Sequence, residues 1–176
     1  MSEIYVISDD HFGHENIIKY TGRPYENYQH MDVELIKNHN SVVKDGDVVY
    51  HIGDFNMSGG KNSPLKIKDY ERQLNGTIVH IKGNHDKSNK MKSILEIALC
   101  KFGGYTFLMQ HVPPLMDAEI PEDCDFVLCG HMHQKWKVNM DLRVPIINMS
   151  VENWNYTPVK LNDVIRFYEK LVGENK

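Results

Sequence analysis

The stretch VLCGHMHQ, residues 127–134, joins an apolar run to a glycine and then to two histidines that are one residue apart. A short apolar run bounded by turn residues is typical of a buried strand. In an extended chain, residues i and i+2 point to the same side. We therefore expect His131 and His133 to face one site just beyond the strand, with Met132 turned away.

The same kind of apolar segment recurs along the chain, and Gly, Asp or Asn bounds each one. The pattern predicts buried strands over residues 4–8, 48–52, 77–82, 105–110, 126–129 and 144–148, with a further candidate over 136–140. Apolar residues at helical spacing predict helices over residues 30–43, 64–74 and about 161–172. This order of elements indicates an α/β domain in which helices cover layered sheets.

Residue types that bind metals follow five of the predicted strands. They are Asp9 and His11, Asp54, Asn84, His111, and His131 with His133. Loops beyond the carboxyl ends of strands in open α/β sheets converge on one crevice, so these residues are expected to meet, with Asp10 aimed elsewhere. Two carboxylates, one amide oxygen and four imidazoles exceed the donors that one ion normally uses, whereas two ions sharing a carboxylate would use them all. A donor set of nitrogen and oxygen without thiolates favours Mn, Fe, Zn, Ni or Co over Mg or Ca.

Five blocks of this sequence, taken in order, resemble the calcineurin-like metallophosphoesterase family, and the segment NMSVENWNY at residues 148–156 is similar to the final part of its small bacterial and phage members. The blocks are DxH at Asp9 and His11, GD at residues 53–54, GNHD at residues 83–86, His111 before Val112 and Pro113, and GHMH at residues 130–133. The resemblance covers residues 1 to about 150. It implies a two-sheet αββα sandwich and a centre of two divalent metal ions.

Carried over by position, the resemblance implies two ligand sets that share Asp54 as the bridge. One ion would take Asp9, His11, Asp54 and His133, and the other Asp54, Asn84, His111 and His131. His85 resembles the family's histidine that meets the scissile phosphate, so Asp54 and His85 are the expected catalytic residues. Asn84 and His85 are expected to contact substrate, together with Arg23 as a bidentate phosphate donor.

These residues predict a hydrolase, a metal-dependent phosphoesterase in which metal-activated water attacks phosphorus and His85 assists the leaving oxygen. Phosphodiesters of nucleotide-like compounds are the favoured substrates, because the compact chain offers no obvious additional recognition domain. One alternative is a phosphomonoesterase acting on nucleotides, sugar phosphates or phosphoproteins. An alternative of another class is a metal-bound binding scaffold without catalysis.

Composition limits the partners and the surroundings of the protein. The 20 Lys and Arg residues against 24 Asp and Glu residues give a net charge of −4, which disfavours long nucleic acids but leaves short ones open. The length of 176 residues is typical of a single domain over residues 1–176. Three cysteines indicate reduced thiols. The lack of a signal peptide or membrane-length apolar run favours a cytoplasmic protein with no membrane contact. We expect no obligate protein partner.

Overall fold

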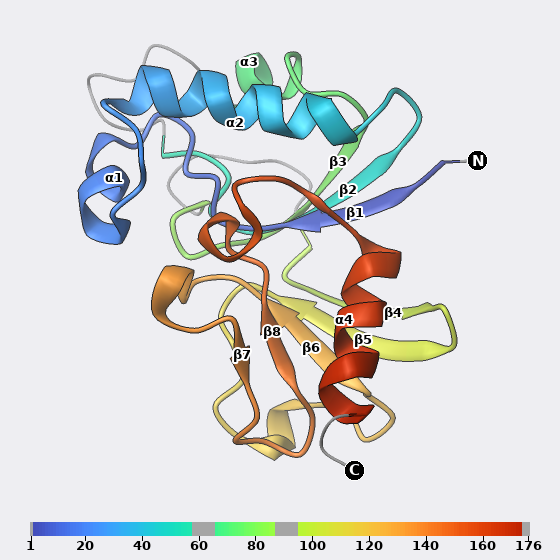
Figure 1. Cartoon of the computed structure of the whole chain (residues 1–176). Coiled ribbons are helices and arrows are strands. Elements are labelled where there is room, and N and C mark those ends of the chain that lie inside the picture. Colours follow the sequence, from blue (N-terminus) through green and yellow to red (C-terminus); the bar gives the residue numbers. More distant parts are fainter. Residues whose placement is uncertain (1, 58–65, 87–94, 174–176) are drawn as a thin grey trace.

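The computed structural model describes residues 2–57, 66–86 and 95–173, and it contains two β-sheets. The first sheet has the order β3-β2-β1-β9 (Figure 1). Its members are β1 (Ile4–Ile7), β2 (Val48–Ile52), β3 (Thr77–Ile81) and β9 (Val159–Lys160). Strands β1, β2 and β3 run parallel, whereas β9 is antiparallel to β1. The carboxyl ends of β1, β2 and β3 therefore lie at one edge of this sheet.

The second sheet has the order β4-β5-β6-β8-β7. Its members are β4 (Ile97–Phe102), β5 (Tyr105–Gln110), β6 (Phe126–Cys129), β7 (Val138–Asn139) and β8 (Ile146–Asn148). The central strands β5, β6 and β8 are parallel, and the two edge strands are antiparallel to their neighbours. The two sheets meet near their strand ends, where Ser8 after β1 pairs with Ser150 after β8.

Four α-helices accompany the sheets in the described part of the chain. They are α1 (Glu15–Thr21), α2 (Tyr28–Val42), α3 (Ile67–Glu71) and α4 (Leu161–Gly173). The first three lie on the outer side of the first sheet, and α4 runs beside the second sheet (Figure 1). Asn27 caps the start of α2, because its side chain accepts a hydrogen bond from the His30 amide. Met31 and Leu35 lie on the buried side of this helix. Among the described residues, the short 3-10 helices η2 (Asp117–Glu119), η3 (His133–Lys135) and η4 (Val151–Trp154) lie within loops.

Apolar packing gives the molecule its layers. The alternating side chains of β5 and β6 send Phe107 and Phe126 inward, where their rings stack at 5.0 Å between centroids. Tyr168 of α4 joins them at 4.7 Å from Phe126, so α4 closes the core between the two sheets. A second cluster lies between the first sheet and α1–α3, and a smaller third one covers the outer face of the second sheet. This arrangement confirms the predicted α/β fold with two sheets.

The strands predicted over residues 4–8, 48–52, 77–82, 105–110 and 126–129 match β1, β2, β3, β5 and β6 to within one residue. The helix expected over 64–74 is shorter, at Ile67–Glu71, and residues 64 and 65 lie outside the described part. The strands expected over 136–140 and 144–148 narrow to Val138–Asn139 and Ile146–Asn148. Strand β4 was not predicted because it is an edge strand that alternates exposed and half-buried residues without a continuous apolar run.

Candidate metal centre

The loops after the strands bend sharply where they carry the predicted ligands. Five of these residues have left-handed backbone angles, with φ of 62° at Asp9, 53° at His11, 55° at Asp54, 70° at His131 and 48° at His133. Such values are uncommon for residues other than glycine and cluster at functional sites. The extended geometry expected for His131 and His133 is therefore wrong, because both residues have left-handed rather than extended backbone angles.

The first group of donors joins the loop after β1 to the loop after β6. The Nε2 atoms of His11 and His133 each lie 3.8 Å from Asp9 Oδ1. One donor atom from each of the three residues fits within a span of 4.8 Å, which suits one metal ion. His11 Nε2 is buried and has no hydrogen-bond partner among the described residues. A buried nitrogen that faces carboxylates without a hydrogen bond fits a metal ligand.

The second group gathers around Asp54 and Asn84. Asp54 Oδ2 lies 3.3 Å from His111 Nε2 and 3.6 Å from His11 Nε2, so this carboxylate contacts both groups. Asn84 Oδ1 lies 2.9 Å from His111 Nε2 and 3.0 Å from His131 Nδ1. His111 Nδ1 donates to the Ile52 carbonyl oxygen at 2.8 Å, which directs Nε2 of the ring toward the centre.

Neighbouring groups shift the pKa values of the buried Asp9 and His111. Ser8 Oγ and Ser150 Oγ donate to Asp9 Oδ2 at 2.7 and 2.8 Å. Burial alone would raise the pKa of Asp9, but contact with the His11 ring and the charges of the nearby imidazoles hold that pKa well below its usual range. Burial likewise opposes protonation of His111, but Asp54 and Asp9 outweigh it and raise the pKa of His111 to about 9.

Asp86 orients the loop after β3. Its Oδ2 accepts hydrogen bonds from the backbone amides of Asp54 and Gly83 at 2.9 and 2.8 Å. Asp54 Oδ1 in turn accepts the amide of His85 at 3.0 Å. The His85 ring lies on the open side of the centre, with a side chain that is 45% exposed and Nε2 4.0 Å from Asp54 Oδ2. This position leaves the ring accessible to a substrate approaching the donors.

The structure places Arg23 differently from the expectation that it contacts phosphate. Its guanidinium is fully buried, and Nη1 and Nη2 donate to the carbonyl oxygens of Asp10 and Asp9 at 2.8 and 2.7 Å. Nε and Nη2 also donate to Glu152. Because these bonds point inward, we correct the role of Arg23 from phosphate donor to a residue that fixes the loop after β1. Asp10 is aimed away as expected, toward His51 Nε2 at 3.2 Å.

Sequence reasoning missed a group of polar residues at the end of β8 and in the segment after it. Ser150 donates to Asp9, Asn148 Nδ2 donates to the His133 carbonyl oxygen at 2.8 Å, and Glu152 contacts His133 Nδ1 at 3.1 Å. The signal was available, because Asn148 ends a predicted strand and Ser150 and Glu152 come shortly after it, where the other strands carry their ligands. His14, outside the ligand set, places Nδ1 3.3 Å from His11 Nδ1, and burial lowers the pKa of His14 to about 4.

The fold and the donor cluster define an α/β protein with candidate metal ligands at the ends of its strands. Residues 3–149 match the family model of the calcineurin-like phosphoesterase superfamily domain. The chain belongs to this superfamily of metal-dependent phosphoesterases, as the sequence blocks predicted.

Two similar proteins extend the match over nearly the whole chain. The uncharacterized protein MJ1445 of Methanocaldococcus jannaschii is 40% identical over 174 residues, which cover 97% of this chain and 93% of that protein. The crystal structure of AQ665, a protein of unknown function from Aquifex aeolicus, has a TM-score of 0.70 at 26% identity and covers 95% of this chain and 100% of the other. Within the residues that the structure describes, none of the helices combines the length and apolar character needed to cross a membrane.

Proposed function

We propose that this protein is a hydrolase that cleaves phosphoesters at a centre of two metal ions. The observation that carries the proposal is the position of Asp54, whose Oδ2 lies within 3.6 Å of a histidine nitrogen from each donor group. A carboxylate shared in this way suits two ions about 3.5–4 Å apart. The buried His11 Nε2, which lacks a hydrogen-bond partner among the described residues, adds support.

Each ion would have four ligands from this chain. One would take Asp9, His11, Asp54 and His133, and the other Asp54, Asn84, His111 and His131. The nitrogen and oxygen donors favour Mn, Fe, Zn, Ni or Co. When bound, such ions supply an activated water near neutral pH and neutralise charge on the phosphate.

The remaining chemistry falls to His85 and Asn84. The His85 ring is accessible beside the shared carboxylate, and its amide is anchored to Asp54 Oδ1 at 3.0 Å. We propose that this ring donates a proton to the leaving oxygen. Asn84 is exposed at the same edge, where its amide group can contact a phosphate oxygen while it serves as a ligand.

Phosphodiesters of nucleotide-like compounds or short nucleic acids suit this centre better than monoesters. A monoester dianion carries one more negative charge than a diester, and Arg23, which was expected to bind phosphate, is instead buried and bonded to Glu152 and to main-chain oxygens. We further propose that the chain acts as a single cytoplasmic domain without an obligate protein partner. Its three cysteines are free, in keeping with a reducing compartment.

The test is hydrolysis of bis-p-nitrophenyl phosphate and p-nitrophenyl phosphate by metal-stripped protein, with Mn, Fe, Ni, Zn, Co or Mg added back separately. We expect metal-dependent turnover of the diester that exceeds turnover of the monoester. His85→Ala is expected to keep bound metal and lose about 10²–10⁴-fold in turnover, whereas His30→Ala, an exposed histidine on α2, is a control expected to match wild type. Faster monoester turnover would make the protein a phosphomonoesterase, and bound metal without turnover of any phosphoester would make it a scaffold.

A further inference from the structure

A buried carboxylate beside the proposed metal centre has no place in the ligand sets. Glu152 lies on η4, and its side chain is only 3% exposed. Its Oε1 accepts hydrogen bonds from Arg23 Nε at 3.1 Å and Nη2 at 2.8 Å, and it also lies 3.1 Å from His133 Nδ1. Burying a carboxylate is costly unless charge partners compensate it, so this position requires the partners that the structure provides.

The contact with Glu152 decides which nitrogen of His133 carries the proton. An ionised carboxylate only accepts hydrogen bonds, so His133 must donate through Nδ1. The lone pair of Nε2 then faces Asp9 Oδ1, 3.8 Å away, in the state that a metal ion needs. Two hydrogen bonds from the buried Arg23 guanidinium to Oε1 hold Glu152 in this ionised form.

Arg23, which binds Glu152, also contacts the loop on the other side of the same metal position. The Arg23 guanidinium that binds Glu152 also binds the main-chain oxygens of Asp9 and Asp10. The Glu152–Arg23 pair therefore links the loop carrying His133 to the loop carrying Asp9 and His11. The buried Glu152–Arg23 pair thus connects two loops whose ligands lie more than 120 residues apart in the sequence.

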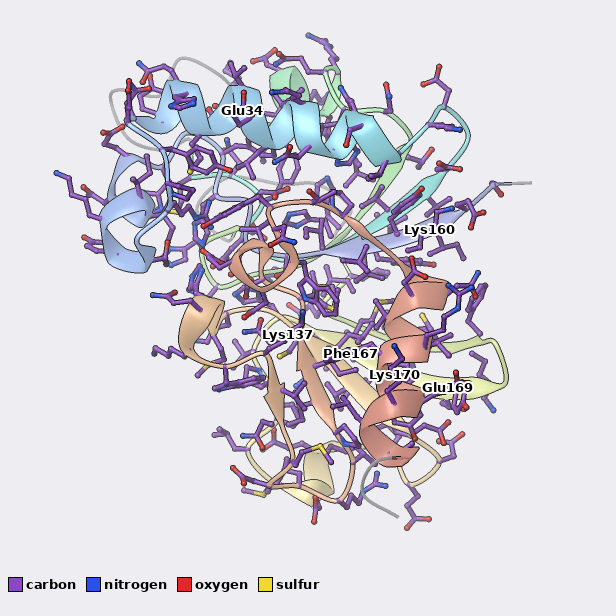
Figure 2. All side chains as sticks on the ribbon, in the orientation of Figure 1. Glu34, Lys137, Lys160, Phe167, Glu169 and Lys170 are labelled. Carbon is purple, nitrogen blue, oxygen red and sulfur yellow. The ribbon has the colours of Figure 1, made fainter. Side chains whose placement is uncertain are left out.

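The helical turn that carries Glu152 is itself held in place. Trp154 Nε1 donates to the Asn148 carbonyl oxygen at 2.8 Å. Lys137 Nζ lies 3.6 Å from the centre of the Trp154 ring and donates to the Asn153 carbonyl oxygen at 2.9 Å. Figure 2 labels Lys137 close to Phe167 of α4, whose ring packs against Trp154 at 5.4 Å. Glu152 thus meets His133 from a fixed element.

We propose that Glu152, supported by Arg23, is a positioning residue that selectively strengthens the metal position containing His133. This inference rests on the two-metal centre of the proposed function. The other three ligand histidines have different partners, since His111 Nδ1 meets a main-chain carbonyl, His11 Nδ1 meets His14 and His131 Nδ1 meets Asn84 Oδ1. Carboxylate partners make a ligating imidazole more basic and fix its orientation, and losing one typically costs about 10–100-fold in metal affinity.

The direct test is calorimetric titration of metal-stripped wild type and Glu152→Gln with Zn²⁺ or Mn²⁺. Gln keeps the shape and an accepting oxygen but removes the charge. We expect one of the two binding steps to weaken by about 10–100-fold and the other to stay at the wild-type value. Glu71→Gln is the matched control, because Glu71 makes a similar contact with His80 at 2.8 Å outside the centre, and it should leave both steps unchanged. Two unchanged steps in Glu152→Gln, or equal weakening of both, would overturn the proposal.

A second measurement keeps the inference separate from the proposed function and from any folding defect of the variant. In metal-free wild type at a pH where the His133 ring is neutral, long-range ¹H–¹⁵N spectra should show the proton on Nδ1, with His133→Gln identifying the signal. A proton on Nε2 would overturn the role of Glu152. If wild type bound no metal while the Nδ1 tautomer was present, the two-metal function would fail and the contact between Glu152 and His133 would stand.

Discussion

At the residue scale, Asp54 connects more of the proposed centre than any other side chain described above. Its amide is held by Asp86, one carboxylate oxygen takes the amide of His85, and the other faces His11 and His111. The left-handed backbone at φ 55° turns the side chain into the centre. Because both donor groups touch this carboxylate, its charge should matter to both metal ions.

Replacing Asp54 with Asn tests that role with little change of shape, because Asn tolerates left-handed backbone. We expect Asp54→Asn to weaken both metal positions by more than the 10–100-fold that is typical of residues outside the ligand set, and hydrolysis to fall with metal content. Metal per chain after dialysis is measured by mass spectrometry. The exposed Asp45→Asn variant is the control. Unchanged metal content in Asp54→Asn would remove its bridging role.

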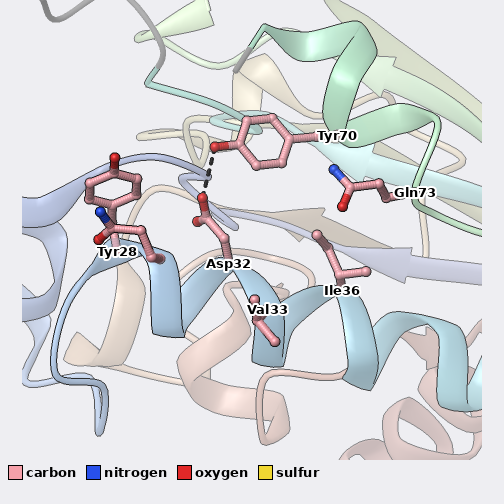
Figure 3. Close-up of a pocket in the computed structure, with 7 residues that line it drawn as sticks. Tyr28, Asp32, Val33, Ile36, Tyr70 and Gln73 are labelled. Carbon is pink, nitrogen blue, oxygen red and sulfur yellow. Dashed lines mark hydrogen bonds between the residues drawn. The ribbon is translucent and has the colours of Figure 1, made fainter. Parts of the chain in front are cut away.

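Asp32 makes a separate prediction about stability. It lines a pocket between α2 and α3, where Tyr70 donates a hydrogen bond to its carboxylate at 2.7 Å (Figure 3). Burial raises the pKa of Asp32 to about 6, against hydrogen bonds from Gly13 and Tyr70 that lower it. Between the ordinary value of 3.8 and about 6, the folded protein binds more protons than the unfolded chain, so this group makes stability fall as pH rises through that window.

Asp32→Asn should remove this loss. We expect the variant to be more stable than wild type at pH 8, by roughly 1–3 kcal/mol, because one pKa unit corresponds to about 1.4 kcal/mol. The gain should shrink toward pH 4. Urea unfolding at both pH values measures it, and an equal stability difference at the two values would show that Asp32 does not titrate in this way.

At the element scale, the sequence predicted which strands are followed by ligands, but it did not predict the left-handed turns on which those ligands lie. Strands with buried centres such as β5 and β6 can be predicted from their apolar runs, and the polar residues directly after them indicate the site. The edge strand β4 lacks such a run, and the contact of Arg23 with Glu152 joins residues 129 positions apart, which no local pattern reveals. The sequence pattern also did not predict the left-handed turns, because Asp and His do not indicate them as glycine does.

The turn after β6 gives a prediction at this scale. Gly130 packs so closely that a Cβ would lie 2.5 Å from Asp9 Oδ2 and 3.0 Å from His111 Nδ1. Gly130→Ala should therefore destabilise the fold by about 1–3 kcal/mol, the usual cost of overpacking, and reduce metal binding. Gly173→Ala at the end of α4 is the control, since nothing lies within 4 Å of its Cβ. Wild-type stability and metal binding in Gly130→Ala would show that the turn can move aside.

At the scale of the whole molecule, the candidate centre lies where the two sheets meet. Asp9 and Asp54 follow strands of the first sheet, and His111 and His133 follow strands of the second. Metal bound there would tie the sheets together in the folded state alone. We expect ions at about 100 times their Kd to stabilise the fold by about 2.7 kcal/mol per site, and chelation to lower the Tm accordingly. The same Tm with and without metal, in protein shown to bind it, would contradict this.

Anomalous diffraction from crystals grown with Mn²⁺ would show whether two ions share Asp54. We expect two anomalous peaks about 3.5–4 Å apart, with Asp54 between them, one beside His11 and His133 and the other beside His111 and His131. A single peak, or a pair of peaks that Asp54 does not touch, would contradict this expectation.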